Sequence, residues 1–162
     1  MSDLLQKMPT TFEPKRKNRW LFRFPSTLGI QEWWLSSGAR PSIDQKEVEI
    51  PFLNTSTWVI GRFTWSTIEL KLYDPIGPSA TQAVMEWVRL HSESITGRQG
   101  YAAGYKQNVE VEMLDPTGVV IEKWQLQGTM CTKADFGSLA MSDDGIAEIS
   151  LTLRFDRAIL VF

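Results

Sequence analysis

The chain has 162 residues, 43% of them hydrophobic and 22% charged, and a formal net charge of -2. Such a length can bury one core without disulfides or metal, and the near-neutral charge gives no overall attraction to nucleic acid or anionic lipid. The single cysteine excludes an internal disulfide, and no apolar stretch approaches the ~20 residues that cross a bilayer. We therefore expect one soluble domain from a reducing compartment, with no membrane insertion.

The first elements in chain order are an N-terminal arm and two strands. Residues 1–17 contain prolines at positions 9 and 14 and lack periodicity, which predicts an arm ahead of a domain over residues 18–162. The basic run near its end consists of Lys15, Arg16, Lys17 and Arg19. We expect these side chains to be solvated or to pair with acidic residues of a neighbouring molecule, and less readily to contact phosphates. An alternating strand starts at Asn18 and ends before Pro25, and a second strand is predicted over residues 30–39. Trp33 and Trp34 cannot both point inward from that strand, so the seven tryptophans indicate either a Trp-rich core or a buried interface.

A long hairpin follows the second strand. Residues 40–63 alternate in two limbs, interrupted by Pro51 and Asn54, which places the tip near Phe52 to Thr55. A segment of this length exceeds a simple connection, and long excursions from compact domains are usually functional. We refer to it as the hairpin arm.

The next strand and helix are the most regular part of the sequence. Ile68, Leu70 and Leu72 alternate with polar residues, as expected for a strand with one buried and one wet face. Two proline turns end the strand, and Ser79 with Gln82 matches a capping box. The helix that follows carries its apolar residues at helical spacing: Ala80, Ala83, Val84, Trp87, Val88 and His91.

The C-terminal half predicts more antiparallel strands. A glycine-rich loop over residues 94–104 precedes a hairpin over residues 108–128, whose turn is Asp115 to Gly118. Residues 147–156 alternate as a last strand, and residues 158–162 form an apolar tail. The expected fold is mainly β: an antiparallel β-barrel or sandwich with one α-helix and a long extended hairpin arm.

The sequence offers little for catalysis. One histidine, His91, and one cysteine, Cys131, give little material for a His/Cys metal cluster or a Ser-His-Asp triad, and both residues are interpreted as packed side chains. The glycines at 97, 100 and 104 lack the Lys-Ser/Thr ending of a phosphate-binding loop. Glu110 and Glu112 share one strand face and indicate a solvated or pore-facing stripe rather than a glycosidase pair. We expect no enzyme activity, cofactor or metal.

Three segments, in this order, carry a family resemblance: GRFTWSTIELKLYD, YKQNVEVEMLDPTGVVIEKWQLQG and DDGIAEISLTLRFDRAIL. From about Asn18 onward the chain resembles the tail tube proteins of contractile-tailed bacteriophages, whose fold is shared with type VI secretion tube proteins. The resemblance implies hexameric rings that stack into an inner tube, assembled in the host cytoplasm as part of the virion tail. The implied partners are further copies of the chain, the tail sheath protein, a baseplate tube-initiator and the tape measure protein, with DNA passing through unbound.

On this interpretation the chain has two functional surfaces. A low-friction lumen should be acidic or polar, because cationic rings would hold every passing phosphate. The candidate lumen-lining residues are Thr67, Glu69, Glu110, Glu112 and Ser150. The candidate anchors of the hairpin arm on a neighbouring subunit or ring are Val48, Ile50, Phe52, Leu53 and Trp58.

Several alternatives remain open at this point. The chain could be the tube protein of a type VI secretion or related contractile injection system, or a baseplate tube-initiator or tail terminator of the same fold. A monomeric β-barrel with an internal ligand site is a second class. A hydrolase using Glu or Asp is the third.

Overall fold

The computed structural model describes residue 7 and residues 9–162, so most of the predicted N-terminal arm before residue 9 lies outside the described residues. The elements in chain order are β1 (Trp20–Arg23), η1 (Ser26–Leu28), η2 (Glu32–Trp34), β2 (Leu35–Ser37), β3 (Ile43–Phe52), β4 (Thr55–Trp65), β5 (Ile68–Tyr73), α2 (Ala80–His91), α3 (Ala102–Tyr105), β6 (Gln107–Leu114), β7 (Val120–Asp135), β8 (Glu148–Arg154) and β9 (Arg157–Leu160).

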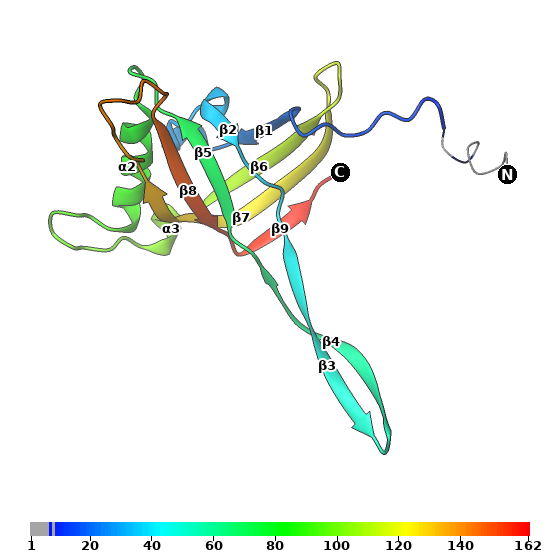
Figure 1. Cartoon of the computed structure of the whole chain (residues 1–162). Coiled ribbons are helices and arrows are strands. Elements are labelled where there is room, and N and C mark those ends of the chain that lie inside the picture. The colour runs from blue at the N-terminus through cyan, green and yellow to red at the C-terminus, as the bar shows by residue number, and fades with distance from the viewer. Residues whose placement is uncertain (1–6, 8) are drawn as a thin grey trace.

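Seven strands form one antiparallel sheet in the order β1-β6-β7-β8-β5-β2, with β9 also paired to β7. The sheet curls into a half-barrel (Figure 1). Strand β7 is 16 residues long, and it pairs with β6 and β9 through its first half and with β8 through its second half. Between the halves lies Gly128, whose φ of 68° is accessible to glycine at little cost. The longest strand therefore links the two ends of the sheet.

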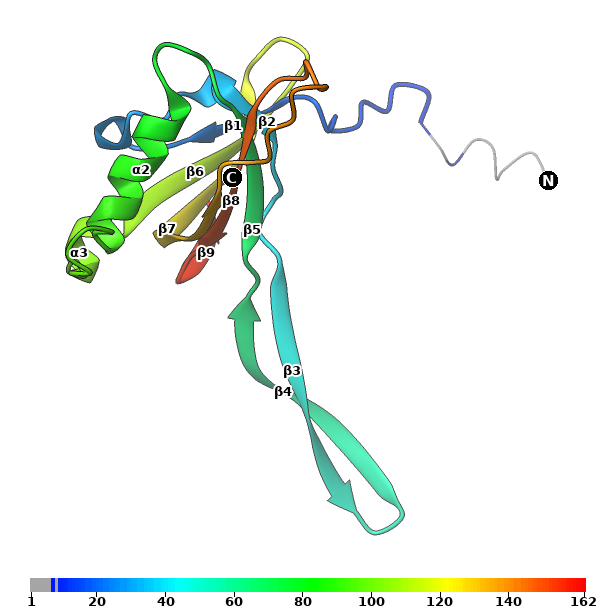
Figure 2. The same cartoon turned by 60° about the vertical axis from the view of Figure 1, so that its left-hand side comes forward.

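Helix α2 covers the concave side of the sheet (Figure 2). Ala80, Val84 and Trp87 are fully buried against it, which confirms the predicted apolar face. The capping-box prediction is wrong: no side-chain cap hydrogen bond forms at Ser79. Instead the Asp74 carboxylate accepts hydrogen bonds from the backbone N–H and the hydroxyl of Thr81, at 3.3 and 2.6 Å. The Asp74 carboxylate, which comes from the turn before the helix, thus accepts the hydrogen bond in the first turn that the Ser79 side chain does not accept.

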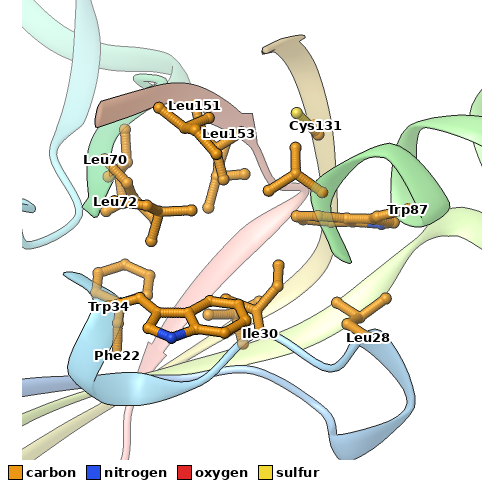
Figure 3. Close-up of a cluster of buried hydrophobic side chains, with 14 of the residues drawn as sticks. Phe22, Leu28, Ile30, Trp34, Leu70, Leu72, Trp87, Cys131, Leu151 and Leu153 are labelled. Atoms are coloured by element: carbon orange, nitrogen blue, oxygen red, sulfur yellow. The ribbon is translucent and has the colours of Figure 1, made fainter. Parts of the chain in front are cut away.

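The core fills the space between the sheet, α2 and the β1–β2 connection. Figure 3 shows aliphatic side chains of β5 and β8, such as Leu70 and Leu151, converging with Trp34 and Trp87 from the covering segments. Trp34 is fully buried and Trp33 is 62% exposed, as expected from their adjacency. The predicted second strand is largely wrong, since residues 32–34 form the 3-10 turn η2 and only Leu35–Ser37 pair with β5. The turn lets Trp34 enter the core while Trp33 points outward.

The C-terminal apolar tail is exposed, as predicted, but it also forms a strand that the sequence did not predict. Strand β9 pairs with the first half of β7, and the backbone bonds continue to Phe162, whose carbonyl accepts from the Lys123 N–H at 2.9 Å. Leu160 and Phe162 nevertheless remain more than half exposed. The predicted return strand, expected to end at Gly128, continues to Asp135 because β8 offers it a second partner. No helix in the described part of the chain is long and apolar enough to cross a membrane.

The hairpin arm, predicted over residues 40–63, consists of β3 and β4 and stands apart from the half-barrel. Within the described residues, β3 and β4 pair only with each other, and they project well beyond the other elements (Figures 1 and 2). Phe52 pairs with Thr55, so the tip is the two-residue turn Leu53-Asn54, with Leu53 at a φ of 50°. The predicted tip is confirmed. A bulge after Gln45 bends the arm near its root.

Candidate assembly surfaces

The hairpin arm exposes apolar side chains on both faces. Directly opposed residues share a face, so Val48 and Val59 lie together with Ile50 and Phe52. Trp58 and Ile60, opposite Glu49 and Glu47, occupy the other face. The tip is the most open part, since Phe52 is 71% and Leu53 87% exposed. All five predicted anchor residues are therefore accessible to another molecule.

A projecting two-stranded arm gains little stability from contacts within its own chain. An isolated two-stranded hairpin is marginally stable in water, and large contiguous apolar patches on soluble proteins mark interaction sites. Within the described residues nothing packs over the outer half of the arm, from position 47 to position 60. We expect the arm to gain its order and stability from a partner.

A second surface is the polar face of β5, β8 and the second half of β7. Cross-strand pairing creates two rows: Glu69–Thr152–Lys133 and Lys71–Ser150–Asp135. Each row carries one acidic and one basic side chain, and together they line a shallow hollow of about 360 Å³. Thr67 lies exposed just before β5. Three lumen candidates, Thr67, Glu69 and Ser150, therefore cluster, but on a charge-balanced surface rather than an acidic one.

The other two lumen candidates lie on β6, separated from β5 and β8 by β7. Glu110 pairs with Lys123 at 3.3 Å, and Glu112 pairs with Arg23 at 3.1 Å. Glu112 is only 3% exposed, so the expectation of a wet surface carboxylate is wrong at this position. The Arg23 side chain on the neighbouring strand covers and neutralises it. The five residues thus form two separate groups.

The sole histidine has a packing role. His91 Nδ1 lies 2.8 Å from the Trp87 carbonyl, and its Nε2 accepts from the Cys131 N–H at 3.1 Å. These contacts fit the neutral tautomer with the proton on Nδ1. The ring also stacks on Tyr105. Burial raises the pKa of Cys131 to about 11, which keeps the thiol protonated and unreactive. The prediction that both residues are structural is confirmed.

One charged group was missed by sequence reasoning. Glu122, on β7, is 8% exposed and accepts from Lys15 Nζ at 2.7 Å and from Arg40 at 3.3 Å. Burial pushes its pKa upward, but the hydrogen bonds from Lys15 and Arg40 oppose this, and the net result is a pKa below the usual glutamate value. The carboxylate fastens the N-terminal arm and the root of the hairpin arm to one strand. Its position between Ile121 and Lys123 gave no sign of this in the sequence.

Replacing Glu122 with Gln is expected to lower the free energy of unfolding by about 1–2 kcal/mol at pH 7, because the ionic hydrogen bonds are lost. The pKa is depressed by folding, so this stabilisation is present above the unfolded pKa and is lost as pH falls through the folded value. Urea unfolding between pH 7 and pH 3 measures it. The difference between wild type and Glu122→Gln should shrink as the solution is acidified, and a constant difference would contradict the assignment.

No protein-family model and no curated protein matches the chain. Solved structures do match, and they define the class of fold: that of tube-like chains from contractile injection particles. The predicted architecture, mainly antiparallel β with one main helix and a hairpin, is confirmed.

The particular structures share little sequence with this chain. A chain in the cryo-EM structure of the anti-feeding prophage cap (AFP tube terminating cap) has a TM-score of 0.73 at 18% identity, covering 94% of both chains. A chain in the sheath/tube terminator of an extracellular contractile injection system (PVC) has a TM-score of 0.74 at 16% identity, covering 94% of this chain and 100% of that one. A type six secretion system protein has a TM-score of 0.53 at 6% identity, covering 88% of this chain and 82% of that one. These identities show a common fold.

Proposed function

We propose that this chain is a structural subunit of the tube of a contractile injection particle and that its copies form hexameric rings that stack. The observation that carries the proposal is the combination of a tube-like fold with a projecting arm that is apolar on both faces. A closed ring removes exposed strand edges, and a repeated contact between rings produces a filament. The sheath is the natural second partner, since similar chains occur in a sheath-tube complex.

The comparisons favour an injection system over the phage tail tube that the sequence resembles. The similar structures come from an anti-feeding prophage, an extracellular contractile injection system and a type six secretion system protein. A phage tail tube remains the second candidate because of the three ordered sequence segments described above. Chains of this fold also occur in a cap and a baseplate structure. Copy number in the particle separates these roles, because a tube subunit is abundant whereas an initiator or terminator is not.

We further propose that the polar face of β5 and β8 lines the lumen, with Thr67, Glu69 and Ser150 at the wall and Glu110 further along the sheet on β6, on the other side of β7. The alternating charges of this face would leave little net attraction for a polyanion or for a folded protein cargo. A tube reconstruction in which these side chains can be located provides the test. A wall formed mainly by Lys and Arg would contradict the low-friction proposal.

Electron microscopy of the purified full chain tests the function. Negative-stain images over a range of concentrations should show rings or tubes of uniform diameter, and light scattering should show mass rising with concentration. A chain that stays monomeric at high concentration, even when seeded with preformed tube ends, would instead support a monomeric binding module.

A further inference from the structure

A cavity of about 350 Å³ lies beside the root of the hairpin arm, between the N-terminal arm, β1, β6 and the segment leading to β3. Its apolar floor is formed by Trp20, which is partly exposed, with Phe22, Val111 and Met113, which are almost or fully buried, beneath it. The volume lies within the roughly 300–1,000 Å³ typical of sites that receive a ligand or an anchoring side chain. The cavity is therefore large enough to accept apolar side chains from outside.

The rim of this cavity is basic and is formed by Lys15, Arg16, Lys17 and Arg40. Glu122 is the acidic group that binds Lys15 and Arg40 there. Among the described residues, no carboxylate lies within 4 Å of the charged atoms of Arg16 or Lys17. The rim therefore carries a net positive charge around an apolar floor.

The outer half of the hairpin arm has the complementary character. Residues 47–60 contain two carboxylates, Glu47 and Glu49, and no lysine or arginine. The tip of this segment carries Phe52 and Leu53, the most exposed apolar side chains of the arm. An apolar tip flanked by acidic residues matches an apolar floor with a basic rim in both hydrophobicity and charge.

The positions of tip and cavity determine which molecules can meet. Arg40 lines the cavity, and β3 begins three residues later at Ile43. The tip is ten residues further along an extended strand, which at about 3.4 Å per residue places it roughly 34 Å from the root. A chain therefore cannot insert its own tip into its own cavity. Any such contact joins two copies head to tail, and this type of contact repeats along an axis.

We infer that the tip of the hairpin arm of one copy docks into the basic, apolar-floored cavity at the arm root of a second copy. This contact supplies the attachment between successive rings and rests on the proposed function. Phe52 and Leu53 contact the floor, and Glu47 and Glu49 lie near Arg16 and Lys17.

Cysteine cross-linking of the full chain tests the contact directly. Cys131 is buried and its pKa is raised to about 11, so introduced cysteines are the reactive ones. A double variant, Leu53→Cys with Lys17→Cys, should give a ladder of covalent multimers on oxidation of assembled material, because the two positions are too far apart to bridge within a chain. The matched control is Ile95→Cys with Lys17→Cys, which places an equally exposed cysteine in a loop and should give no ladder.

Charge reversal provides a second readout. Arg16→Glu with Lys17→Glu should raise the critical concentration for assembly at least tenfold, and Glu47→Lys with Glu49→Lys should do the same. All four changes together should restore assembly, which a merely misfolded variant could not do. If wild-type tubes form but the cross-link is absent and the reversals have no effect, the docking contact is wrong while the proposed function stands. If wild type forms neither rings nor tubes, the proposed function fails first.

Discussion

Trp58→Ala should leave the half-barrel folded and strongly weaken polymerisation. Trp58 is 55% exposed in the free chain and lies on β4, which among the described residues pairs only with β3. The substitution therefore removes little from the core, and thermal unfolding should change by no more than a few degrees. Loss of an aromatic anchor from an interface typically costs ~2 kcal/mol or more, which raises the critical concentration about 30-fold. Sedimentation of assembled material over a concentration series measures this change.

The matched control is Trp33→Ala. Trp33 is 62% exposed, so the same side chain is removed at similar exposure, but from η2 on the half-barrel instead of from the hairpin arm. Assembly of Trp33→Ala should stay close to that of wild type. A variant lacking residues 47–60 is the stronger form of the experiment, and intact tubes from that deletion would refute the role of the arm.

Trp87→Ala should remove a large part of the stability of the domain. Trp87 is fully buried on α2, packs edge-on against Phe24 and donates from Nε1 to the Tyr105 carbonyl at 2.9 Å. Truncation of a buried Trp costs about 3–5 kcal/mol, compared with roughly 5–15 kcal/mol for a whole domain. The melting temperature should fall by on the order of 10 °C, as followed by circular dichroism.

Trp87→Phe separates packing from hydrogen bonding at the same position. The phenyl ring retains most of the buried apolar area, but the Tyr105 carbonyl loses its donor, so the cost should be about 1–2 kcal/mol. If Trp87→Ala and Trp87→Phe destabilise the protein equally, the contribution of Trp87 comes from its hydrogen bond to α3 rather than from its packing.

Local periodicity was enough to predict the regular elements. Strand β5 alternates strictly, and its apolar residues face the core as expected from a period of two. The same reasoning failed where tertiary contacts decide the structure. The second half of β7 has no clear alternation, and β8 rather than its own sequence makes it a strand. The η2 turn likewise exists because Trp34 must enter the core while Trp33 does not.

The site residues show the same division. The hairpin arm could be predicted because residues 40–63 are too long for a simple connection and are interrupted by Pro51 and Asn54. The burial and the ion-pair partners of the carboxylates could not be predicted from the sequence. Glu110 and Glu112 have the same spacing in sequence as any surface pair, and only the neighbouring β1 supplies the arginine that covers Glu112. Glu122 is bound by residues 107 and 82 positions away, a distance that no local pattern reports.

The two apolar faces of the hairpin arm also set the number of molecules that must meet there. A two-stranded ribbon with a single apolar face can bury that face against one partner protein. Here Ile50 and Trp58 point to opposite sides, so one partner would leave half of the ribbon in water. Removing the whole ribbon from water would take two surfaces, one against each face. The proposed ring assembly would have to supply both.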